Sequence, residues 1–183
     1  MFNNWLTDSL GDECAFTLPG AKDLLLIRSE ALVAYTIDEE DTITGMSILE
    51  GEYFLDYKAT RNLNYKVTAQ KSKHGTVYGV NLNLTIRHIS AQHTRLFARL
   101  LDSRITVILS DMNGQYWLIG DRQPLKATEA SYGSESNAYV LELNTTQKTP
   151  VLRVSADFVK SIVPKPVGGG YVLPGYVTVG YTF

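Results

Sequence analysis

The chain has 183 residues and 20.4 kDa, and its 17 basic and 19 acidic residues give a formal net charge of −2. A chain of this length buries about 70% of its unfolded surface as one domain, so its stability requires no metal or disulfide. The charge balance argues against a protein that grips nucleic acid through a cationic patch. No apolar run reaches the roughly 20 residues of a membrane span, and residues 1–10 lack the pattern of a signal peptide. We therefore expect synthesis in the cytoplasm.

The N-terminal part predicts a short helical segment and then strands. We treat residues 1–19 as an N-terminal arm, in which Phe2, Trp5, Leu6 and Leu10 fit one face of a helix. Phe2 and Trp5 are interface candidates. From residue 24 onward, apolar runs recur at roughly the 8-to-12-residue spacing typical of a sandwich or barrel. These expected strands are 24–27, 31–35, 43–49 and 53–57.

The segment 76–131 predicts a strand, a helix and a hairpin. Apolar Val80, Leu82, Leu84 and Ile86 alternate with polar residues, as in a strand with one buried face. A helix is expected over 91–101, with Ser90 at its first turn and one apolar side formed by Leu96, Phe97, Leu100 and Leu101. Asn113 and Gly114 lie between apolar runs 105–109 and 115–119, which indicates a type I′ turn with both residues at positive φ.

The C-terminal part predicts three more strands and then an arm. The strands are expected at 125–131, 138–143 and 151–154. Pro164 and Pro166 favour extended backbone, and the three glycines at 168–170 favour a flexible joint, so we predict a domain over 20–163 and an arm over 164–183.

The predicted arm is uncharged after Lys165, and Gly-Tyr pairs recur in it every five residues. This period fits neither helix nor strand, so the arm is interpreted as an interaction segment. An ordinary last strand or a disordered end remains the alternative. The arm's interface candidates are Tyr171, Tyr176, Val177, Val179, Tyr181 and Phe183.

The sequence offers little material for catalysis or metal binding. His88 and His93 are five residues apart, whereas helix-borne metal pairs are usually three or four apart, and His74 fits a solvated turn. The acidic run 38–41 lacks the spacing of a calcium loop, and Cys14 lacks the cationic surroundings that activate a thiol. We therefore predict no catalytic residue, no metal and no cofactor.

The segment IRHISAQHTRLFARLLDSRITVILSDMNGQYWLIGDRQPLKATEAS, residues 86–131, resembles structural proteins of tailed bacteriophages. It is most similar to the small tail-tube and neck-ring proteins of phages that infect gut bacteria, the crAss-like group among them. The similarity covers residues 20–163. It implies a mainly β sandwich or barrel flanked by one helix and an assembly role without a catalytic residue. The tail from Val167 to Phe183 departs from the family's pattern, so the extended N- and C-terminal arms expected here come from the sequence and not from the resemblance.

The resemblance implies a non-enzymatic virion protein that forms a homomeric ring in the tail or the head-to-tail neck. Its partners would be other copies and adjacent ring, portal or tail proteins, with DNA passing through the channel without specific binding. Two other functions remain open. One is a ligand-binding β module that uses its aromatic residues for a carbohydrate or small molecule, and the other is a hydrolase with paired carboxylates.

Overall fold

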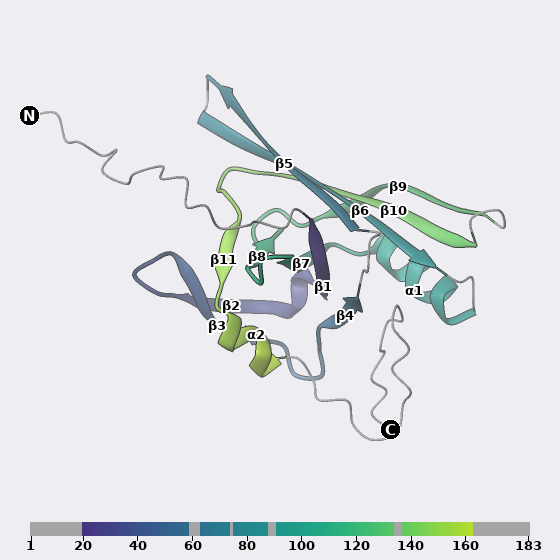
Figure 1. The fold of residues 1–183 in the computed structure, drawn as a ribbon, viewed down its shortest axis with the longest axis horizontal. Helices are drawn as coiled ribbons and strands as arrows, with labels where there is room; N and C mark the ends of the chain where they lie inside the picture. The colour runs from purple at the N-terminus through teal and green to yellow at the C-terminus, as the bar shows by residue number, and fades with distance from the viewer. Residues whose placement is uncertain (1–19, 59–62, 74, 88–90, 134–136, 163–183) are drawn as a thin grey trace, which may run out of the picture.

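The computed structural model describes residues 20–58, 63–73, 75–87, 91–133 and 137–162, and this part of the chain is mainly β, as predicted (Figure 1). A seven-stranded sheet has the order β2-β3-β11-β8-β7-β1-β4. Its strands are β1 (Ala21–Arg28), β2 (Leu32–Ile37), β3 (Thr42–Ile48), β4 (Leu55–Lys58), β7 (Ile105–Asp111), β8 (Tyr116–Ile119) and β11 (Leu152–Val154). A four-stranded sheet has the order β5-β6-β10-β9, formed by β5 (Leu63–Ser72), β6 (Gly75–Arg87), β9 (Lys126–Gly133) and β10 (Ala138–Gln147).

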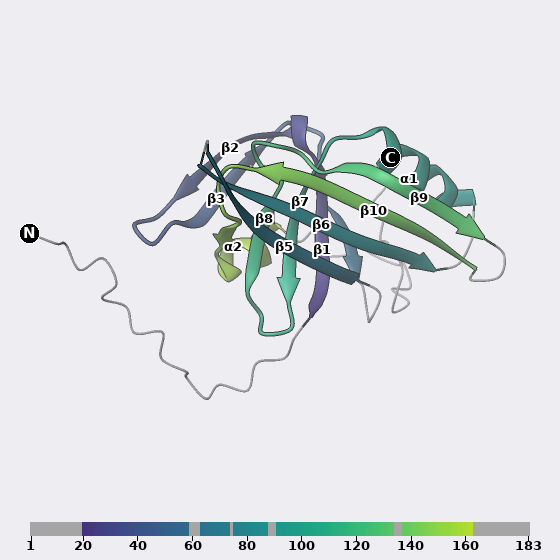
Figure 2. The ribbon, with the colours of Figure 1, turned by 90° about the horizontal axis from the view of Figure 1, so that it is seen from above.

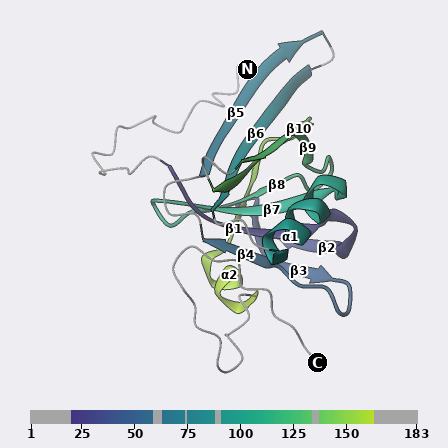
Figure 3. The ribbon, with the colours of Figure 1, turned by 90° about the vertical axis from the view of Figure 1, so that its right-hand side faces the viewer.

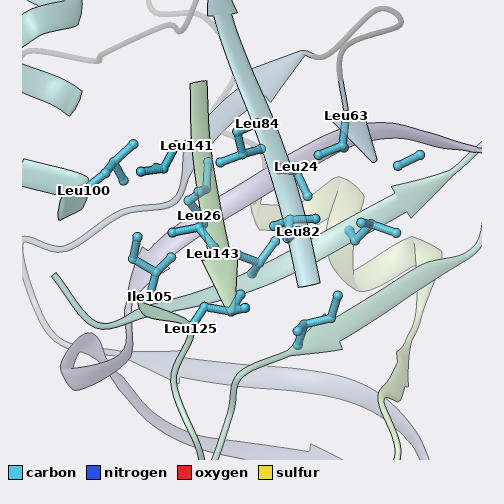
Figure 4. Close-up of a cluster of buried hydrophobic side chains, with 14 of the residues drawn as sticks. Leu24, Leu26, Leu63, Leu82, Leu84, Leu100, Ile105, Leu125, Leu141 and Leu143 are labelled. Atoms are coloured by element: carbon cyan, nitrogen blue, oxygen red, sulfur yellow. The ribbon is translucent and has the colours of Figure 1, made fainter. Parts of the chain in front are cut away.

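The two sheets lie one above the other and enclose the larger hydrophobic core (Figures 3 and 4). Strand period explains this core, because every second side chain of β6 and β10 points at the seven-stranded sheet. The buried residues come from both sheets: Leu24, Leu26, Val107 and Leu109 on one, and Val80, Leu82, Leu84, Leu141 and Leu143 on the other.

A second core lies on the opposite face of the seven-stranded sheet. Leu25 and Ile27 of β1 turn to this side and pack with Ile108 and Leu118. The helix α2 (Ala156–Ile162) covers this side through Val159. Strand β7 therefore has buried side chains on both faces, and all its residues are buried. Its near-continuous apolar sequence reflects this position.

Three described elements were not predicted from the sequence: β5, α2 and a 3-10 turn. Strand β5 was missed although Leu63, Tyr65 and Val67 alternate with polar residues as in a strand; it lies at an edge, where Tyr65 and Val67 stay partly exposed. The helix α2 was missed because its seven residues are too few for a clear apolar stripe. The 3-10 turn over Ser29–Ala31 joins β1 to β2.

The predicted helix is present as α1 (Ala91–Asp102), one residue longer than expected. Phe97 and Leu100 are buried in the larger core, and the ring of Phe97 lies 4.8 Å from that of Tyr139 between centroids. Leu101 was placed on the same side from its spacing, but it is 38% exposed, so the buried stripe is narrower than predicted. Leu96 is among the residues whose side chains are not described, and Ser90 lies outside the described residues.

The predicted hairpin joins β7 to β8, but its turn type was predicted wrongly. Only Gly114 has positive φ, at 77°, and Asn113 does not share this conformation. The Gly114 amide donates to Asp111 O at 3.2 Å, as in a type I turn followed by a left-handed glycine. The carboxylate of Asp111 fixes this geometry because its Oδ1 accepts from the amides of Asn113 at 2.8 Å and Gln115 at 2.9 Å.

We expect Gly114→Val to lower the free energy of unfolding by about 1–3 kcal/mol, because a β-branched residue is strained at positive φ. Met112→Val in the same loop is the control, since Met112 is exposed and lacks positive φ, and its loss should stay within about 0.5 kcal/mol. Chemical denaturation measures both. Equal stability of the two variants would contradict the assigned turn.

We expect Phe97→Ala to cost about 3–5 kcal/mol of unfolding free energy, since it empties a buried aromatic position. Leu101→Ala, on the same helix but largely exposed, should cost less than about 1 kcal/mol. Urea denaturation of both variants distinguishes them. A small loss for Phe97→Ala would mean that α1 does not form part of the core.

Candidate functional site

The most distinctive surface is the outer face of the four-stranded sheet, which turns away from the core (Figure 2). Its residues alternate along each strand with the buried ones, so they share one side of the pleat. Val140 and Val77 are its large apolar residues within the described strands; Val77 stands opposite Gln70. We call this surface the polar face; its other side chains are Asn64, Lys66, Thr68, Gln70, Asn81, Asn83, Thr85, Lys126, Thr128, Glu129, Ser131, Glu142, Asn144 and Thr146.

A hydrogen-bond network fixes the centre of the polar face. Glu142 Oε1 accepts from the side-chain amide of Asn81 and from that of Asn144, the second at 3.0 Å. Asn144 Nδ2 also donates to Thr128 Oγ1 at 2.7 Å. Three neighbouring strands are thereby joined through side chains as well as through their backbones. Such a network holds short polar side chains flat on the sheet.

The charges of the described side chains on the polar face balance. Two lysines, Lys66 and Lys126, are matched by two glutamates, Glu129 and Glu142, and the remaining polar groups described there are amides and hydroxyls. A neutral surface of this kind offers hydrogen bonds to water without a cationic field for phosphate groups. The polar face can therefore lie against a nucleic acid without retaining it.

Both edges of this sheet are open in the described part of the chain. No other described strand pairs with the outer edge of β5 or of β9. Successive strands are antiparallel, so with four strands β5 and β9 run in opposite directions. Open edges are usually covered or paired in soluble proteins.

A second candidate is an open groove of about 1030 Å³ between α1, the end of β1 and residues 51–53. Arg95 and Arg99 lie one helical turn apart along it. Arg28 forms a salt bridge with Glu52, and this hydrogen bond raises the pKa of the Arg28 guanidinium. The groove can hold an anionic group. The Ser103 hydroxyl in its lining donates to Arg99 O at 2.6 Å and not to a carboxylate.

The described residues contain no group of three or more side chains suited to a metal ion. The acidic run 38–41 forms the exposed turn between β2 and β3, where Asp38 Oδ1 accepts from the amides of Glu40 and Thr42 at 2.9 Å. Glu129 and Glu142 are opposed carboxylates on neighbouring strands. They lie on the open polar face, and Glu142 is engaged by two amides, so the pair does not form the enclosed site of a hydrolase.

The predicted interface residues in both arms lie outside the described residues, as do His74, His88 and Cys14; the side chain of His93 is also not described. The polar face itself was missed from the sequence. Its signal was present in the polar half of each alternating strand, but the edge strand β5 had not been recognised. Without β5, neither the extent of the sheet nor its open edge could be inferred.

Comparison of the chain with family models, with curated proteins and with solved structures found no match. Among the described helices, none has the length and apolar character needed to cross a membrane.

Proposed function

We propose that the protein is a non-enzymatic virion component that closes into a homomeric ring in the tail or head-to-tail neck of a tailed phage. The four-stranded sheets of successive copies line the channel through which DNA passes. The observation that carries this proposal is a sheet with one buried face, one neutral polar face and two open edges. Assembly takes place in the host cytoplasm, and the neighbours are adjacent ring, portal or tail proteins.

The direction of the strands supports ring closure. In a cyclic ring each copy is related to the next by a rotation, so β9 of one copy meets β5 of its neighbour. These edges run in opposite directions, and their pairing continues the antiparallel order without interruption. Repetition around the axis yields a closed barrel, which removes every open edge of this sheet.

The chemistry of the polar face supports its position in the channel. The buried face already packs on the seven-stranded sheet, so only the polar face can line the lumen. A cationic lumen would bind the phosphate backbone and slow DNA passage, whereas balanced charges and amides leave DNA hydrated. The resemblance of residues 86–131 to tail-tube and neck-ring proteins is an independent support.

We expect the purified full-length chain to form ring particles in negative-stain electron microscopy. Val67→Lys should abolish them, because a charge on the core side of the β5 edge opposes strand addition. Val33→Lys is the matched control: it lies on β2, the edge of the other sheet, and should leave the rings intact. Monodisperse monomers at high concentration, together with a melting shift on adding a sugar or small molecule, would favour the ligand-binding alternative.

We expect the wild-type ring not to retain duplex DNA at physiological salt. Asn83→Lys with Thr146→Lys adds two cations to the polar face of each copy and should tighten DNA binding at low salt by about tenfold or more, with a steep salt dependence. The control pair Met112→Lys with Gln123→Lys adds the same charge elsewhere on the exposed surface. Filter binding measures all three. Equal DNA binding by the two double-lysine variants would contradict the proposal that the polar face lines the channel.

A further inference from the structure

The two open edges carry exposed apolar side chains on the same side of the sheet. Tyr65 of β5 is 38% exposed although its cross-strand partner Leu82 is fully buried. At the other edge, Tyr132 of β9 is 70% exposed while its partner Tyr139 is buried. Directly opposed residues share a face, so both tyrosines lie on the core side. The core is therefore left uncovered at both ends of the sheet.

Tyr132 belongs to an aromatic cluster with Phe97 and Tyr139 at the open edge of β9. Its ring lies 5.7 Å from Tyr139 and 6.5 Å from Phe97 between centroids, with an edge-on geometry to the phenylalanine. Beyond β9 no described residue of this chain continues the sheet. A second copy added at this edge would supply the missing neighbour.

The register within the sheet restricts how two copies join. Lys66, Asn81, Asn144 and Lys126 are successive cross-strand partners and form one row. If copies joined without a shift along the strands, Lys126 would stand opposite Lys66 of the next copy. Like charges in direct opposition destabilise a strand pair. The same arrangement would place Tyr132 beyond the N-terminal end of β5.

Barrel closure requires a shift, and its size follows from strand geometry. Strands of closed barrels are tilted by about 35–45°. With about 3.3 Å per residue along a strand and about 4.8 Å between strands, a shift of four residues across four strands gives a tilt of about 35°. This value does not depend on the number of copies. Of the two directions of shift, one leaves Tyr132 opposite a residue of β5.

We propose, on the basis of the ring proposed above, that β9 of one copy pairs with β5 of the next with this four-residue shift. The bulge of β9 at Thr128, which already interrupts its register on β10, is carried into the new ladder. On the core side, Tyr132 then stands opposite Tyr65, and the two smaller pairs are Ala130 with Val67 and Ala127 with Ala69. All are apolar. The exposed tyrosines of the two edges meet and complete the cluster begun by Phe97 and Tyr139.

The same register also avoids like-charge pairs between copies on the polar face. Lys126 stands opposite Gln70 of the neighbour instead of a lysine. Glu129 stands opposite Thr68 and diagonal to Lys66, which offsets the like charge of Glu142 across the β9–β10 ladder. One shift therefore satisfies the tilt of a barrel, the apolar side and the charged side together.

Cysteine cross-linking tests the register directly. In a Cys14→Ser background, which removes the one native cysteine, Gln70→Cys with Lys126→Cys places a thiol at each edge. We expect mild oxidation to give a covalent ladder up to the full ring, because directly opposed residues meet the distance requirement of a disulfide. Lys66→Cys with Lys126→Cys is the matched control. Its thiols would lie about 13 Å apart along the strands and should not cross-link.

The possible results distinguish a failure of the proposed register from a failure of the proposed ring. A ladder from the Lys66 pair but not the Gln70 pair would overturn the shift, and rings in which neither pair reacts would overturn the edge pairing. Absence of rings would overturn both proposals. A second measurement is the concentration dependence of assembly: Tyr132→Ala should weaken it by about tenfold or more, and Tyr132→Phe should not. Tyr53→Ala, at an exposed tyrosine away from either edge, is its control.

Discussion

Burial of one face of the four-stranded sheet against the seven-stranded sheet is the interaction on which the rest of the structure depends. Leucines of β6 and β10 enter the core at every second position, and β7 supports them from the opposite sheet. Because strand side chains alternate, the same packing places the asparagines and threonines between them on the outside. The polar face is thus a direct consequence of the core, which already determines that it points outward. The hydrogen bonds of Glu142 with Asn81 and Asn144 then fix the positions of its side chains.

The same packing leaves the sheet incomplete at its edges. The seven-stranded sheet and α1 bury Leu82 and Leu84 of β6 and Leu141 and Leu143 of β10, but Tyr65 of β5 and Tyr132 of β9 stay exposed. Within the described residues, two open strand edges and exposed aromatic side chains favour association with another chain. Four antiparallel strands give edges of opposite direction, which suits repeated head-to-tail addition and closure into a ring. The aromatic cluster at β9 and the apolar strip at β5 are complementary halves of one proposed contact.

Much of the fold could be predicted from the sequence. The alternation in 80–86 and the apolar run 105–109 follow directly from which side chains are buried in each strand. The turn at Gly114 was located correctly but given the wrong geometry, since the decisive contact is the Asp111 carboxylate, which no local pattern indicates. Leu101 shows that helical spacing alone cannot set the width of a buried stripe. The polar face escaped prediction because it depends on the order of strands in the sheet, a non-local property that residue spacing does not contain.

Cryo-electron microscopy of the assembled protein tests the central claim most directly. The account predicts a closed barrel to which each copy contributes β5, β6, β10 and β9, with Asn81, Asn144 and Thr146 pointing into the lumen. The seven-stranded sheets would form an outer layer around it. A map in which this sheet faces outward, or in which the edges of β5 and β9 remain unpaired between copies, would contradict the account.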